Sequence, residues 1–87
     1  MLKLYTKDVC PFCTTAKDYL INLEIQFEEV NVQQDQGARE FLINEGHRTV
    51  PQIYYGNHQY IPGGCSALLG LTKDEIQLLT GGGDVNQ

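Results

Sequence analysis

Basic residues and long apolar runs are both scarce in this sequence. Its 87 residues include six Lys or Arg and eleven Asp or Glu, which gives a formal net charge of −5. The six cations are scattered along the chain, whereas proteins that bind nucleic acid cluster them to neutralise phosphates. No stretch approaches the roughly 20 apolar residues that cross a membrane, and residues 1–5 are too short and polar for a signal peptide. We therefore expect a cytoplasmic protein that binds neither nucleic acid nor membranes.

Tryptophan is absent, and the chain contains only three cysteines. In a reducing compartment, such a small and odd number of cysteines fits catalysis better than a framework of structural disulfides. The chain is long enough for one domain with a modest core and too short for two. We predict a single domain over residues 1–80, a flexible tail over residues 81–87, and a monomer.

Two of the cysteines, Cys10 and Cys13, are separated by Pro11 and Phe12 and follow a short apolar run. At the start of a helix, this spacing lets the two sulfurs meet in a disulfide. Free N–H groups and the positive end of the helix dipole then stabilise a thiolate at Cys10, and Pro11 fits the first helical turn. Cys13 lies one turn further in and should ionise less readily. We interpret Cys10 as the attacking thiol and Cys13 as the resolving thiol.

Apolar spacing and turn residues predict the element order β-α-β-α-β-β-α. We expect strands near residues 2–6 and 27–32, helices over 11–23 (capped by Asp8) and 35–46, a hairpin over 50–61, and a last helical region at 68–79 with a capping box at 72–75. Strands joined through a helix should run parallel, while the hairpin adds antiparallel pairing. The prediction is an α/β protein with a mixed four-stranded sheet flanked by three or more helices, which matches a thioredoxin fold.

Three short motifs occur together in the chain: CPFC at residues 10–13, TVP at residues 49–51 before the expected hairpin, and GGCS at residues 63–66 after it. In this combination, which extends over residues 1–79, the chain resembles the glutaredoxins. Phe12 replaces the Tyr that glutaredoxins commonly carry and keeps an aromatic wall. Conventional thioredoxins usually carry Gly-Pro between the two cysteines and a Trp before them, so that class is disfavoured.

The resemblance implies a glutathione site around the TVP and GGCS motifs. In glutaredoxins the residue matching Pro51 is a cis proline, and the backbone of the preceding residue, here Val50, pairs with the cysteinyl part of glutathione. The N–H groups at the start of the following helix, here at residues 64–66, receive the γ-glutamyl carboxylate, as helix-start amides favour anions. Lys7 and Arg39 match positions near the glycine carboxylate. The implied glutathione-binding residues are Lys7, Phe12, Arg39, Thr49, Val50, Pro51, Gly64, Cys65 and Ser66.

One position departs from the glutaredoxin pattern. Relatives usually place Asp two residues after the cysteine of the GGCS segment, where it meets the γ-glutamyl ammonium, and Ala67 occupies that position here. A charge-assisted contact of this kind is worth roughly 1.5 to 3 kcal/mol when well formed. We therefore expect this chain to bind glutathione more weakly than a typical relative. We interpret Cys65 as a small, partly buried packing residue and not as a redox group.

The resemblance further implies a thiol–disulfide oxidoreductase that acts in electron transport and cell redox homeostasis. The Cys10 thiolate attacks a protein disulfide or a glutathione mixed disulfide, and either Cys13 or glutathione resolves the intermediate. Glutathione is the expected co-substrate, and we expect no tightly bound cofactor. Protein disulfide clients, ribonucleotide reductase among them, are the expected partners.

Two alternatives stay open at this point. The first is a dedicated redoxin that donates electrons to ribonucleotide reductase and is itself reduced by thioredoxin reductase; Ala67 keeps this reading open. The second is a carrier of an iron–sulfur cluster, with Cys10 and glutathione as ligands. We predict no metal site of zinc type, because no second closely spaced ligand pair accompanies Cys10 and Cys13.

Overall fold

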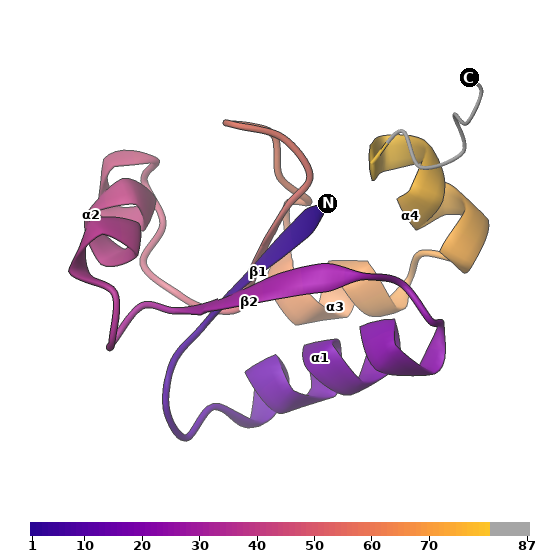
Figure 1. Cartoon of the computed structure of the whole chain (residues 1–87), viewed down its shortest axis with the longest axis horizontal. Coiled ribbons are helices and arrows are strands. Elements are labelled where there is room, and N and C mark those ends of the chain that lie inside the picture. Colours follow the sequence, from indigo (N-terminus) through magenta and orange to yellow (C-terminus); the bar gives the residue numbers. More distant parts are fainter. Residues whose placement is uncertain (81–87) are drawn as a thin grey trace.

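The computed structural model describes residues 1–80. The tail expected over residues 81–87 lies outside the described residues. Figure 1 shows the arrangement of the elements, which follow one another as β1 (Leu2–Thr6), α1 (Pro11–Asn22), β2 (Phe27–Asn31), α2 (Gln36–Asn44), β3 (Gln52–Tyr54), α3 (Gly64–Leu69) and α4 (Lys73–Thr80). Within residues 1–80, no helix has the length and apolarity that a membrane crossing requires.

The sheet of the described chain has three strands in the order β2-β1-β3, with β1 parallel to β2 and antiparallel to β3. The mixed sheet is therefore confirmed, and the predicted fourth strand is wrong. Residues 59–61 fold back beside β3 through a bridge between Tyr54 and Tyr60 and through hydrogen bonds from the Ile61 N–H to the Ile53 carbonyl and from the Tyr55 N–H to the Gln59 carbonyl. Pro62 follows at once and has no N–H to donate, so the pairing cannot lengthen into a ladder.

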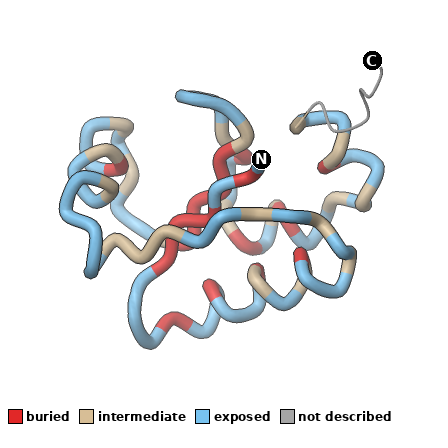
Figure 2. Tube along the Cα trace, in the orientation of Figure 1, coloured by how far each residue is buried: buried red, intermediate tan, exposed pale blue. Residues whose placement is uncertain are grey.

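The core lies in two layers, one on each face of β1. Leu2 and Leu4 face α1, α3 and α4 and pack with the other buried residues of that cluster, which are Ala16, Leu20, Ile53, Ile61, Cys65, Leu68 and Ile76. Tyr5 points to the opposite face, where it packs with Leu42 of α2 and with Tyr54. Figure 2 shows the buried positions along β1 and on the inner sides of α1 and α3. Full burial of a side chain such as Leu20 contributes about 1.5–3 kcal/mol.

The start of α1 differs from the expectation in one detail. Cys10, not Asp8, is the N-cap residue, and its Sγ accepts a hydrogen bond of 3.2 Å from the Cys13 N–H. Asp8 lies two residues before the N-cap, and Val9, between Asp8 and Cys10, turns the chain with a φ of 49°. Asp8 therefore does not cap the helix. The Asp8 carboxylate instead accepts a hydrogen bond of 2.8 Å from the Asn31 side-chain amide. This contact fastens the loop before α1 to the end of β2.

The last helical region of the described chain consists of two helices. α3 ends at Leu69, and α4 begins at Lys73. The predicted capping box at the start of α4 is confirmed, since the Thr72 N–H donates to Glu75 Oε1 at 2.9 Å and the Glu75 N–H donates to Thr72 Oγ1 at 3.2 Å. Two short helices can turn around the core where one long helix would run past it.

Candidate active site

The CPFC segment places two sulfurs at the N-terminus of α1. Cys10 and Cys13 form a disulfide, with their Cα atoms 5.2 Å apart. Cys10 is 9% exposed and Cys13 is 3% exposed. The predicted order of depth is thus confirmed, with Cys10 the more accessible of the two.

The backbone around Cys10 presents positive partial charge to its sulfur. Cys10 itself is extended, and its sulfur takes the place of a capping oxygen by accepting the Cys13 N–H. Its carbonyl already accepts the Thr14 N–H at 3.0 Å, which closes the first turn of the helix. No acidic residue occupies this first turn. Once the disulfide is reduced, the free N–H groups and the helix dipole favour the thiolate of Cys10 over its thiol.

Apolar surface surrounds the cysteines on the solvent side. Val9 is 94% exposed and Phe12 is 68% exposed. A β-branched residue with positive φ, as Val9 has, is rare and is found most often where a functional site imposes it. Sequence reasoning missed Val9, and no residue-level signal pointed to it, because valine is a type that disfavours this conformation.

A groove of about 430 Å³ lies beside the start of α1. Phe12 forms part of its wall, and the rest comes from the segment before β3 and from the start of α3. The Val50–Pro51 peptide bond is cis, as predicted. This groove brings together most of the residues predicted for glutathione, namely Phe12, Thr49, Val50, Pro51, Gly64, Cys65 and Ser66.

Two glycines allow the segment around Pro51 to approach α3 closely. Gly63 has a φ of 102° and caps α3, and Gly64 has a φ of 62°. A Cβ on Gly63 would lie 2.9 Å from the Cβ of Ala67, and a Cβ on Gly64 would lie 3.2 Å from the Pro51 carbonyl oxygen. Glycine is thus required here by both the backbone conformation and the space.

Cys65 begins the buried side of α3 and is 7% exposed. It belongs to the core cluster between the sheet and α1, and burial raises the pKa of its thiol. A thiol that is harder to ionise is a poorer nucleophile. Both observations agree with the interpretation of Cys65 as a packing residue.

A second groove, of about 390 Å³, adjoins the first one. Thr49 and Val50 line both grooves, and the second extends to α2. Lys7 and Arg39, the remaining two predicted residues, both line it. Arg48 also lines it and was missed; its position directly before the TVP motif was the available signal.

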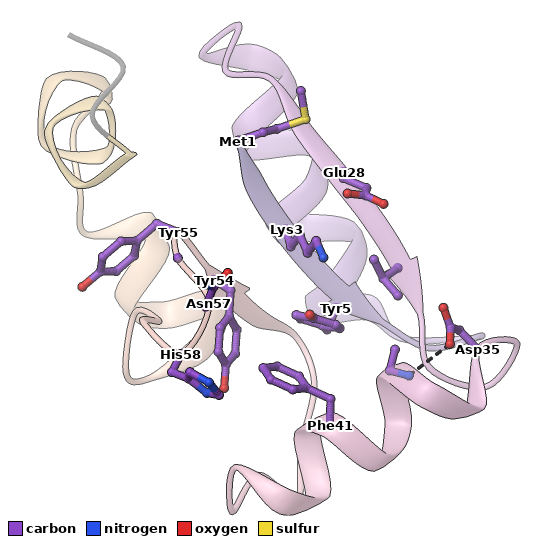
Figure 3. Close-up of a pocket in the computed structure, with 13 residues that line it drawn as sticks. Met1, Lys3, Tyr5, Glu28, Asp35, Phe41, Tyr54, Tyr55, Asn57 and His58 are labelled. Carbon is purple, nitrogen blue, oxygen red and sulfur yellow. Dashed lines mark hydrogen bonds between the residues drawn. The ribbon is translucent and has the colours of Figure 1, made fainter. Parts of the chain in front are cut away.

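A third hollow, of about 700 Å³, lies between β1 and α2 on the face of the sheet to which Tyr5 points, and no cysteine lines it. Figure 3 shows Tyr5, Phe41 and Tyr54 gathered in it, between β1, α2 and the loop that carries His58. The Tyr54 hydroxyl donates to Glu45 Oε1 at 3.0 Å, and His58 Nδ1 lies 3.0 Å from Glu45 Oε2. Burial and the neighbouring Glu45 carboxylate raise the pKa of Tyr54. These contacts join the loop after β3 to α2.

Within residues 1–80, no group of three or more His, Cys, Asp or Glu side chains is placed to hold a metal ion.

Comparisons with known proteins agree with this geometry. The family model for glutaredoxin matches residues 2–61. Glutaredoxin 3 of Escherichia coli (strain K12) is 38% identical over 71 residues, which cover 80% of this chain and 83% of that protein.

Two solved structures share the fold. Buckwheat glutaredoxin, solved as a complex with glutathione, is 25% identical, with a TM-score of 0.71 over 94% of this chain and 78% of that one. The glutaredoxin-like protein NrdH-redoxin of Escherichia coli, described as having a thioredoxin-like activity profile, is 30% identical, with a TM-score of 0.62 over 64% of this chain and 74% of that one. With its CPFC pair, its thioredoxin-like fold and these matches, this chain belongs to the glutaredoxin family.

Proposed function

We propose that this protein is a glutathione-dependent thiol–disulfide oxidoreductase, with Cys10 as nucleophile and Cys13 as resolving thiol. The proposal rests on the position of Cys10 at the N-cap of α1, where its sulfur accepts a hydrogen bond from the Cys13 N–H. Membership of the glutaredoxin family supports the same reaction.

The reaction proceeds by two thiol–disulfide exchanges. The Cys10 thiolate attacks one sulfur of the client disulfide; a Cys10–client bond forms, and the other client sulfur leaves as a thiolate that takes a proton from water. The Cys13 thiolate then attacks the Cys10 sulfur, which forms the Cys10–Cys13 disulfide and releases the second client thiolate. Two electrons pass to the client. Two molecules of glutathione reduce the enzyme again and become glutathione disulfide.

Glutathione is the co-substrate that the two grooves suit best. Neither the N–H nor the C=O of Val50 is hydrogen-bonded to any residue within 1–80, so this residue is open to an added backbone. Pairing of a short peptide with one residue whose backbone groups are unpaired is a small case of strand addition. The start of α3 and the cations Lys7 and Arg39 lie on the two sides of Val50 and suit the two carboxylates of glutathione.

A dedicated redoxin is the second candidate. Ala67 removes an acidic side chain that glutaredoxins usually direct at glutathione, and the chain resembles NrdH-redoxin of Escherichia coli. In this case thioredoxin reductase supplies the electrons and ribonucleotide reductase is the client. For either candidate we propose a monomer that acts in the reducing environment of the cytoplasm.

The test is the turnover of a glutathione mixed disulfide, measured with glutathione and glutathione reductase, and in parallel with thioredoxin reductase alone. Turnover with glutathione that exceeds turnover with thioredoxin reductase supports the proposal. Turnover with thioredoxin reductase and none with glutathione identifies the protein as a dedicated redoxin instead. Absence of turnover in both arms contradicts both.

A further inference from the structure

The groove that Lys7, Arg39 and Arg48 line concentrates positive charge in an acidic protein. These three residues are half of the six Lys and Arg of a chain whose net charge is −5, although they are far apart in the sequence. Among the described residues that line this groove, none is Asp or Glu. The hollow of about 700 Å³ between β1 and α2, by contrast, is lined by Lys3 together with Glu28 and Asp35.

The three cations are not neutralised within the described protein. The ion pairs formed by residues 1–80 are those of Lys17 with Glu29 and of His58 with Glu45. No side chain of residues 1–80 is hydrogen-bonded to the Lys7, Arg39 or Arg48 side chains either. Three exposed cations that share a groove repel one another and gain from an anionic ligand.

The position of the basic groove beside Val50 indicates which residues of a bound client would lie in it. The open backbone of Val50 offers one N–H and one C=O, while Pro51 has no N–H to add. An antiparallel partner can exchange both bonds with a single residue. In that register, the client residues after the paired cysteine lie beside Arg48 and Thr49, which precede Val50 and line the basic groove.

We propose that this groove selects disulfide clients in which acidic residues follow the reactive cysteine. The inference rests on the proposed function and deepens it by naming the client class. The groove, at about 390 Å³, is also larger than a single terminal carboxylate needs, so it has room for the side chains of an acidic segment. Ile43, which is 59% exposed, and Val32 add an apolar wall for the stems of those side chains.

The experiment uses three peptides, each with one cysteine in a mixed disulfide with thionitrobenzoate. One peptide has two Asp after the cysteine, the second has two Asn there, and the third has two Asp before the cysteine. The reduced Cys13→Ser protein attacks the peptide sulfur through Cys10; the Cys10–peptide bond forms and the coloured thionitrobenzoate leaves as its thiolate. Its absorbance gives the rate constant, and mass spectrometry identifies the peptide on Cys10.

We expect the peptide with Asp after the cysteine to react about fivefold faster than the Asn peptide at low salt, since each exposed charge pair adds a modest amount. The preference should decline as salt is added. Arg39→Glu/Arg48→Glu should abolish or reverse it. Lys73→Glu on α4 changes one charge away from both grooves and should leave the preference intact.

Equal rates for the first two peptides, with release from both, would overturn the client class while leaving the proposed function intact. A preference for Asp before the cysteine, or one that survives Arg39→Glu/Arg48→Glu, would also overturn it. No release from any peptide would remove the proposed function and this inference with it.

Discussion

Cys10 ends an extended segment and begins α1, and this double position distinguishes it from Cys13. Its backbone has a φ of −134° and a ψ of 97°, while the next residue is already helical. The sulfur therefore lies where the first N–H groups of the helix have no partner of their own. Cys13 lies one turn further in and is 3% exposed. We therefore expect the two thiols to differ in reactivity because of their positions alone.

The two cysteines should respond differently to replacement. Cys10→Ser should abolish all exchange, because Cys13 and Cys65, the other thiols of the described residues, are more deeply buried than Cys10. Cys13→Ser should keep activity on glutathione mixed disulfides, which glutathione itself can resolve, and lose it on protein disulfides. Turnover of both substrates by each variant checks this. An equal, partial loss from the two changes would contradict the roles.

Ala67 offers a direct test of how glutathione is bound. Ala67→Asp should lower KM for a glutathione mixed disulfide by about tenfold with little change in kcat, because one charge-assisted hydrogen bond to the ammonium group is added. Ala67→Asn is the control of equal size without the charge and should give a smaller effect. If both variants leave KM unchanged, position 67 does not face the γ-glutamyl end.

At the level of residues, chemistry with a local cause could be predicted from sequence. The spacing of Cys10 and Cys13 predicted their place at the start of a helix, whereas the cis bond before Pro51 was implied by the resemblance to glutaredoxins and not by the local sequence. The positive φ of Val9 could not be predicted, since it is imposed by the loop around it. Arg48 joins Lys7 only after α2 and the sheet have brought distant segments together.

Among the elements, helix ends are set locally and strands are set by their neighbours. Thr72 and Glu75 cap α4 through contacts three residues apart, which the sequence displays openly. The segment after β3 has suitable residues for a strand, yet its pairing stops at Pro62 and Gly63. A segment forms a strand only if a neighbouring segment can pair with it through a ladder of hydrogen bonds. The alternation of apolar and polar residues within one segment does not show whether such a neighbour exists.

The capping box at α4 should contribute measurably to stability. Thr72→Ala removes the hydroxyl that accepts the Glu75 N–H and should lower the free energy of unfolding by about 1 kcal/mol. Thr72→Ser keeps the hydroxyl and should cost much less. Urea unfolding of the three proteins measures the difference. A Thr72→Ala protein as stable as the parent would show that α4 is held by Ile76 and its packing alone.

Across the whole molecule, Glu29 joins three elements on one face of the sheet. Its carboxylate lies 3.0 Å from Lys17 Nζ of α1 and accepts a hydrogen bond of 2.9 Å from Thr6 Oγ1 of β1. The hydrogen bond from Lys17 is the main reason that the pKa of Glu29 lies below its ordinary value, with burial acting in the opposite direction. The charged carboxylate therefore stabilises the folded protein more than the unfolded one.

This contact predicts a dependence of stability on pH. A carboxylate with a lowered pKa in the folded state stabilises the protein above its unfolded pKa, and that stabilisation is lost as pH falls through the folded pKa. The parent should exceed Glu29→Gln in stability near about pH 7, and the gap should narrow as pH falls below the ordinary glutamate pKa of about 4.3. Urea unfolding across this range tests it. A gap that does not change with pH would contradict a role for the charge.

The N-terminus of α1 is expected to stabilise the thiolate of Cys10 more than that of Cys13. The most direct measurement is the rate at which iodoacetamide alkylates each cysteine of the reduced protein as a function of pH, with the modified residue identified by mass spectrometry. We expect Cys10 to react first, and its rate to reach half its maximum at a pH well below the pKa of about 8.5 of a free cysteine. Alkylation of Cys10 and Cys13 at equal rates, with a midpoint no lower than that of a free cysteine, would contradict it.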